Sequence, residues 1–103
     1  MDKMDKWDKA MRKALRAELD NCGGEVFAFA DEGVTVVVVP SAGQDSAFAR
    51  VAVAQCDFVD DSFKRKRGEL IALERWQNGE SIAVRVNDRE FDEIAETVLD
   101  LIV

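Results

Sequence analysis

Histidine and tyrosine are both absent from the 103-residue sequence. Histidine is the usual side chain for proton transfer near neutral pH, the common activator of serine and cysteine nucleophiles, and a frequent zinc ligand. Without it, only scattered carboxylates remain as candidate catalytic groups. The composition therefore predicts a protein that is not an enzyme and that holds no metal or cofactor.

Cysteines and long apolar runs are also scarce. The two cysteines, Cys22 and Cys56, lie far apart and form no Cys-x-x-Cys pattern, so we interpret them as buried, reduced thiols. The longest apolar run, Val34 to Pro40, includes Thr35 and is far too short to cross a membrane. The N-terminus is charged and lacks the apolar core of a signal peptide. We therefore expect a cytoplasmic protein with neither a disulfide nor a membrane contact.

Basic residues are outnumbered by acidic ones. The chain has 14 Lys and Arg against 21 Asp and Glu, which gives a formal net charge of −7. A domain that binds nucleic acid over its surface normally carries surplus positive charge to neutralise phosphates, so we expect no bulk nucleic-acid binding. Hydrophobic residues make up 48% of the chain and charged residues 34%, which is typical of a folded protein. The length predicts one domain over residues 1–103.

Hydrophobic periodicity predicts an α+β fold. It consists of a small four-stranded, mostly antiparallel sheet with three helices, in the order α-β-β-β-α-β-α. The predicted helices are Asp5–Asn21, Ser62–Gln77 and a last helix that opens at a capping box in residues 87–90. The predicted strands are Glu25–Ala30, Val34–Val39, Ala47–Cys56 and Ser81–Val86. The first two strands form a hairpin, and the all-apolar second strand indicates a central position with both faces buried.

Residues 1–22 contain an amphipathic helix that either packs on the sheet or extends from it. Its apolar residues fall near one stripe, which comprises Met4, Trp7, Met11, Ala14, Leu15, Leu19 and Cys22. The glycines at 23 and 24 end this helix, because glycine readily adopts the left-handed conformation of a C-terminal cap.

The middle helix is a basic element in an acidic chain, since residues 63–79 carry five basic and two acidic side chains. Gly68 costs about 1 kcal/mol relative to alanine inside a helix, and close approach of a ligand or a second backbone is the usual reason for such a glycine. Arg65 and Arg75 beside the small residues Gly68 and Ala72 predict a shallow cationic groove. The candidate partner- or anion-binding surface comprises Arg65, Lys66, Gly68, Ala72, Arg75 and Trp76.

Other interpretations of this helix stay open. Its basic side chains could be a solvated face that pairs with the acidic flanks of the chain. Trp76 lies off the apolar face and could anchor an interface, or it could pack against the N-terminal helix or the sheet edge. A module that binds a nucleotide or another small anion at the same basic face is the alternative to a protein-binding surface.

The stretch from Val51 to Arg75 resembles short proteins encoded by tailed bacteriophages and prophages, which carry the pattern D-x-F-x-[RK]-K-x-G-x-x-I-A-x-x-R. The matching positions are Asp61, Phe63, Arg65, Lys66, Gly68, Ile71, Ala72 and Arg75, with Cys56 upstream. This resemblance covers about a quarter of the chain. It implies a phage-encoded accessory protein. Small phage proteins often bind and divert host machinery, so the implied partner is a host protein. An inhibitor of a bacterial defence system, comparable to an anti-CRISPR protein, is one form of that role.

Acidic residues form a second candidate surface. They comprise Asp57, Asp60, Asp61, Asp92, Glu93 and Glu96. Spaced carboxylates can imitate a phosphate backbone, so a DNA-mimic inhibitor is a further alternative. The competing interpretation is a solubilising face plus helix N-termini, where acids are favoured by the helix dipole. The sequence contains no glycine-punctuated calcium loop, and it leaves open whether the protein forms a homodimer.

Overall fold

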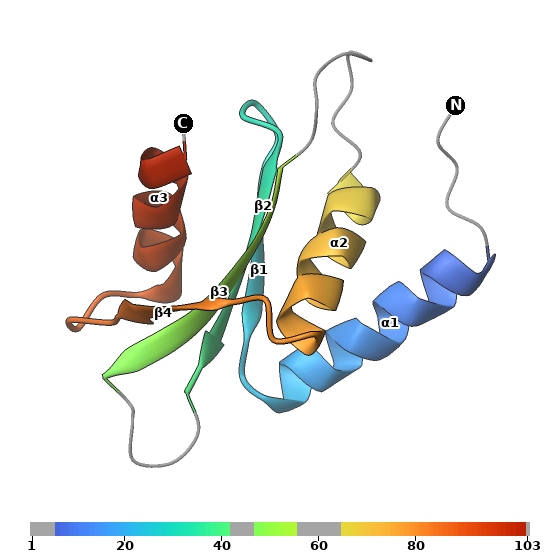
Figure 1. Ribbon diagram of the computed structural model, residues 1–103, viewed down its shortest axis with the longest axis horizontal. Coiled ribbons are helices and arrows are strands. Elements are labelled where there is room, and N and C mark those ends of the chain that lie inside the picture. Colours follow the sequence, from blue (N-terminus) through green and yellow to red (C-terminus); the bar gives the residue numbers. More distant parts are fainter. Residues whose placement is uncertain (1–5, 42–46, 56–64, 103) are drawn as a thin grey trace.

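The computed structural model describes residues 6–41, 47–55 and 65–102 (Figure 1). The helices in these ranges are α1 (Lys6–Asn21), α2 (Arg65–Gln77) and α3 (Phe91–Ile102). The strands are β1 (Glu25–Phe29), β2 (Val34–Pro40), β3 (Phe48–Gln55) and β4 (Ile82–Arg85). The element order α-β-β-β-α-β-α and the α+β class confirm the sequence prediction. None of the described helices is long and apolar enough to cross a membrane.

The four strands form one sheet in the order β1-β2-β3-β4, and each neighbouring pair is antiparallel. Val36 on β2 pairs with Phe27 on β1 and with Val53 on β3, so β2 lies between β1 and β3. Gly33 closes the β1–β2 hairpin with a φ of +67°, a conformation that glycine adopts without steric cost. The predicted hairpin is therefore confirmed.

Helices cover both faces of the sheet, with α1 and α2 on one side and α3 on the other (Figure 1). Val37 and Val39 of β2 belong to the core on the α2 side. Their neighbours Val34, Val36 and Val38 belong to the core on the α3 side. Both faces of β2 are thus buried, which confirms the interpretation of its all-apolar sequence. Full burial of one such side chain contributes about 1.5–3 kcal/mol to folding.

The end of α1 is fixed by a glycine cap. Gly24 N–H donates to the Leu19 carbonyl at 2.9 Å, and Gly23 N–H donates to the Asp20 carbonyl at 3.1 Å. Gly23 has a φ of +76°, so these two bonds form a Schellman motif around a left-handed residue. A Cβ on Gly24 would lie 2.5 Å from Leu19 Cδ1. The turn therefore brings the backbone of residue 24 directly against the last turn of α1.

Only part of the predicted apolar stripe of α1 is buried. Leu15 and Leu19 pack in the core, whereas Trp7 is 82% exposed and Met11 is 48% exposed. Ala14 and Cys22 are exposed as well. The reason is geometric, because α1 rests chiefly on α2 and its first turns extend beyond the end of that contact (Figure 1). The stripe is therefore covered at Leu15 and Leu19 and uncovered at Trp7, Met11 and Ala14, while Met4 lies outside the described residues.

Candidate functional site

A buried carboxylate joins α1 to α2. Glu69 of α2 is only 7% exposed, although it carries a charge. Its Oε1 accepts a hydrogen bond from Arg16 Nη1 at 2.7 Å, and its Oε2 lies 3.5 Å from Arg12 Nη1. Two guanidinium groups from successive turns of α1 thus neutralise one carboxylate of α2. We call Arg12, Arg16 and Glu69 the ionic cluster.

The ionic cluster fixes how α1 lies on α2. The hydrogen bond to Glu69 raises the pKa of Arg16 above its ordinary value, with a smaller contribution from Asp20. Arg16 Nε also lies 3.5 Å from Asp20 Oδ1 on its own helix. A buried charge without its partner is strongly destabilising, so the docking of α1 depends on these contacts as well as on Leu15 and Leu19.

A cavity of about 240 Å³ opens beside the ionic cluster, and it is lined by Arg16, Val26, Ala28, Thr35 and Glu69. Thr35 is fully buried on β2, and its hydroxyl has no hydrogen-bond partner among the described residues. The Nε atoms of Arg12 and Arg16 are buried and likewise form no hydrogen bond within the described part of the chain. Polar and apolar groups therefore face one small cavity that is partly open to solvent.

The predicted groove on α2 does not have the expected shape. Ala72 is fully buried and belongs to the core, and Gly68 is buried as well. Both residues face the protein interior because α2 packs against α1 and against three strands of the sheet. They cannot form the exposed floor of a cationic groove, which corrects that expectation. Arg65 begins α2, but its side chain lies outside the described residues.

The remaining residues of that surface have mixed environments. Lys66 is exposed. Arg75 Nη1 donates a hydrogen bond to the Val53 carbonyl at 2.6 Å. The pairing of β3 with β4 ends at Val51, so Val53 belongs to the part of β3 that has no β4 neighbour. Arg75 is thus already bonded to the edge of the sheet. Trp76 is half-buried and packs against the core on the α2 side, so much of its ring is already covered.

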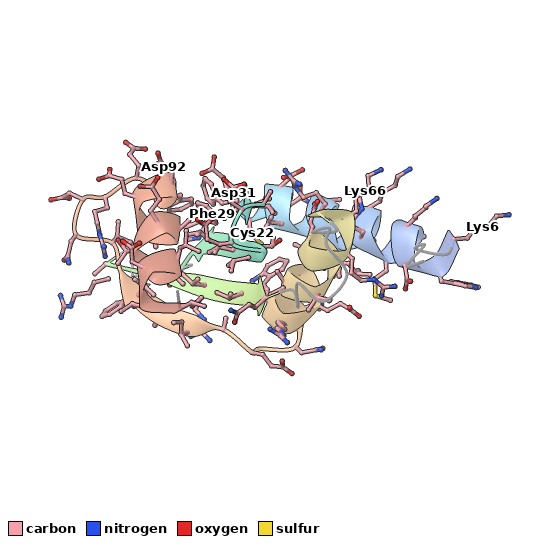
Figure 2. The ribbon with its side chains drawn as sticks, turned by 90° about the horizontal axis from the view of Figure 1, so that it is seen from above. Lys6, Cys22, Phe29, Asp31, Lys66 and Asp92 are labelled. Atoms are coloured by element: carbon pink, nitrogen blue, oxygen red, sulfur yellow. The ribbon has the colours of Figure 1, made fainter. Side chains whose placement is uncertain are left out.

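The acidic surface is described only in part. Asp92, Glu93 and Glu96 are all exposed on α3, whereas Asp57, Asp60 and Asp61 lie outside the described residues. Glu93 Oε1 accepts a hydrogen bond from the Glu90 N–H at 3.1 Å, and α3 begins at Phe91. The capping interaction therefore lies at residues 90–93, which corrects the predicted capping box at residues 87–90. The α3 carboxylates and the first turns of α1 lie at opposite ends of the molecule, as the positions of Asp92 and Lys6 in Figure 2 show. Within the described ranges, no group of three or more potential ligands is placed to hold a metal ion.

Two features were missed by sequence reasoning. The uncovered apolar face of α1 has a weak signal, because the apolar residues from Trp7 to Leu19 spread over more of the helix than one contact can bury. The ionic cluster has no local signal, since Glu69 lies 53 residues from Arg16.

The thiol of Cys22 is free and exposed, which corrects the expectation that it is buried; Cys56 lies outside the described residues.

Comparison of this chain with protein-family models, with curated proteins and with solved structures found no match.

Proposed function

We propose that this protein acts by binding a partner protein through the first turns of α1. The contact surface consists of the exposed apolar residues Trp7, Met11 and Ala14, flanked on one side by Lys6 and Lys13. We call these five residues the α1 face. The resemblance to short phage proteins makes a bacterial host protein the expected partner, and inhibition of a defence system the expected consequence of binding.

The exposure of Trp7 is the observation that carries this proposal. A tryptophan side chain can bury 150–250 Å², and tryptophan is enriched among the residues that dominate binding energy at interfaces. Trp7 is 82% exposed, and Met11 follows four residues later on the same side of the helix. A rigid helix that presents a large aromatic and an adaptable methionine is typical of a helix that docks in an apolar groove.

The charges beside this stripe define the chemistry of the partner. Lys6 and Lys13 are exposed, whereas the two arginines of α1 are engaged by Glu69. The matching surface is therefore an apolar groove with acidic residues along one rim. Charge complementarity of this kind raises the association rate more than the affinity, and it weakens with added salt.

The test uses two variants with matched exposure. Leu101 on α3 is 81% exposed, so Leu101→Ala removes as open an apolar side chain as Trp7→Ala, at the opposite end of the molecule. The partner is captured from bacterial lysate, identified by mass spectrometry, purified, and titrated with each variant. We expect Trp7→Ala to weaken binding by about thirtyfold, the equivalent of a hot spot worth about 2 kcal/mol, and Leu101→Ala to have no effect. Equal losses for both variants, or none for Trp7→Ala, would refute the proposal.

The α3 carboxylates support a second candidate, an acidic surface that competes with DNA for a host protein. The helix carries Asp92, Glu93, Glu96 and Asp100 and no basic residue. Substitution of Asp92 and Glu96 by lysine would abolish binding in that case, while Trp7→Ala would leave it unchanged. The two candidates therefore predict opposite results from the same pair of variants. The nucleotide-binding alternative on α2 loses its geometric basis, since Gly68 and Ala72 are buried.

A further inference from the structure

We propose that the free edge of β1 binds an extended segment of a partner protein. The segment adds a strand beside β1 and carries a lysine or arginine next to Glu25 and a glutamine next to Ala28. This site lies apart from the first turns of α1, as the positions of Phe29 and Lys6 in Figure 2 show, and it does not depend on the proposed function.

The two edges of the sheet differ in how they are protected. Edge strands are commonly shielded by charged side chains, proline, bulges or short length. The β4 edge has four residues and carries the exposed Arg85, and beyond β4 the Val53 carbonyl on β3 accepts a hydrogen bond from Arg75. Strand β1 pairs with β2 in an unbroken register, contains neither proline nor a basic residue, and has its one charge at Glu25, its first position. Among the described strands its single neighbour is β2, so alternate N–H and C=O groups of β1 remain for another strand.

Side chains of β1 alternate between the two faces of the sheet. Phe27 and Phe29 pack against the core on the α3 side, so Glu25 points to that side as well. Val26 packs against the core on the α2 side, and Ala28 lines the cavity of about 240 Å³ on the same side. A strand added beside β1 has the same alternation, so its successive side chains face a pocket on one side of the sheet and this cavity on the other.

The pocket on the α3 side favours a basic side chain. It is a broad, open pocket of about 450 Å³ at the start of β1 and α3, and its charged lining residues are Asp20, Glu25, Arg89 and Glu90. Arg89 donates its hydrogen bonds to backbone carbonyls and one hydroxyl rather than to these carboxylates. Even with Asp20 assigned to Arg16, its partner at 3.5 Å, two carboxylates face one guanidinium group. The lining therefore has a net negative charge, and we call this site the acidic pocket.

The cavity on the α2 side favours a neutral amide. Its polar lining consists of Arg16, Glu69 and Thr35, which offer donors and acceptors without a net charge. The Thr35 hydroxyl is fully buried and has no hydrogen-bond partner among the described residues, so it is a group to which a ligand can bind. Thr35 pairs with Ala28, so a residue added beside Ala28 lies on the same rung, about two strand spacings or ~10 Å away. A glutamine side chain can extend over the small Ala28 toward Thr35.

A second copy of this chain fits the edge less well. Antiparallel pairing of two β1 strands places the two α3 helices on the same face of the joined sheet. Helix α3 carries Asp92, Glu93, Glu96 and Asp100 and no basic residue, so the two helices would repel each other. Strand β1 itself has no basic side chain for the acidic pocket and no glutamine for the cavity. The charges therefore favour a segment of a different protein.

The experiment titrates the protein with the acetylated peptide amide Thr-Lys-Gln-Lys-Gln-Lys-Thr, whose lysines face one side of a strand and whose glutamines face the other. Backbone amide signals are followed by NMR, and hydrogen exchange is measured at saturation. We expect saturable shifts centred on β1 and slower exchange of its amides, because an added strand gives them new hydrogen-bond acceptors. A peptide with glutamate in place of each lysine should not bind. Absence of saturable shifts in β1, or equal binding of the glutamate peptide, would overturn the proposal.

Two charge reversals test the acidic pocket. Glu25→Lys should weaken binding of the lysine peptide by about fivefold, because an exposed attraction becomes a repulsion. Glu80→Lys changes the net charge equally, but Glu80 is exposed just before β4 at the opposite edge, so it should have no comparable effect. Equal losses for the two variants would mean that binding follows net charge alone, and they would refute the site.

Thr35→Val tests the cavity and should weaken binding of the lysine peptide by roughly threefold to tenfold, the usual effect of one lost hydrogen bond. A peptide with valine in place of both glutamines should bind the wild type and this variant equally. The same loss for both peptides would contradict the position of the glutamine. A concentration-dependent dimer with slowly exchanging β1 amides would show that a second copy covers the edge, and it would also overturn the proposal.

Discussion

Helices α1 and α3 both carry strong apolar stripes, but the stripe of α3 is covered by the sheet, whereas the stripe of α1 is covered only in part. Helix α3 lies along the sheet and buries Ile94, Ala95 and Val98 against β2 and its neighbours. Helix α1 meets the body through Arg12, Arg16 and the buried Leu15 and Leu19, and it leaves Trp7 in solvent. An amphipathic pattern therefore predicts that a helix has an apolar face, but it does not predict whether residues of the same chain bury that face.

The largest expected effect tests whether the covered parts of the two helices are equivalent. Leu19 on α1 and Ile94 on α3 are both fully buried. Leu19→Ala and Ile94→Ala should each lower the free energy of unfolding by about 2–5 kcal/mol, because each leaves a cavity in a packed core. Chemical denaturation measures both values. If Leu19→Ala cost less than about 1 kcal/mol, α1 would be only loosely attached along its whole length.

The ionic cluster marks the boundary between the covered and uncovered halves of α1. Glu69→Ala should destabilise the protein by about 1–3 kcal/mol, less than loss of a fully buried pair, because Arg16 is 42% exposed and water can reach it. Glu69→Gln keeps the shape and some hydrogen bonding, so it should cost less. Thermal unfolding of the two variants distinguishes charge from packing, and equal losses would contradict an ionic role.

A smaller effect on stability is expected on α2, where one basic residue is hydrogen-bonded to the sheet and another is only exposed to solvent. Arg75 donates to the Val53 carbonyl, whereas Lys66 is exposed and has no described role in packing. Arg75→Ala should cost about 0.5–1.5 kcal/mol, the usual contribution of one hydrogen bond. Lys66→Ala should change stability by less than about 0.5 kcal/mol. Urea denaturation of both variants provides the comparison, and identical values would show that the bond to β3 contributes nothing.

The smallest effect is expected at the uncovered end. Trp7→Ala should leave the unfolding free energy within about 0.5 kcal/mol of the wild type, because its side chain is 82% exposed. Helical content measured by circular dichroism should also be unchanged. A large loss of stability would mean that Trp7 packs against the body of the protein in solution, and it would remove the α1 face as a contact surface.

Much of the fold followed from local patterns. The valine run of β2 predicted a strand buried on both faces, and the glycines after Asn21 predicted the end of α1; both predictions are confirmed. The candidate site was harder to predict from the sequence. Gly68 and Ala72 were expected to border a groove because they are small, but small residues also allow helices and strands to approach closely. Only the packing partners of α2 decide between these two roles.

The sequence alone determined the element order, the antiparallel hairpin and the positions of the buried strands, because periodicity and turn chemistry act over a few residues. The tertiary structure decided which apolar face of α1 is covered, which basic residues are already bonded, and that Glu69 meets Arg12 and Arg16. These outcomes depend on contacts between residues more than twenty positions apart. Such contacts arise from how the helices dock on the sheet, and no local pattern in the chain encodes them.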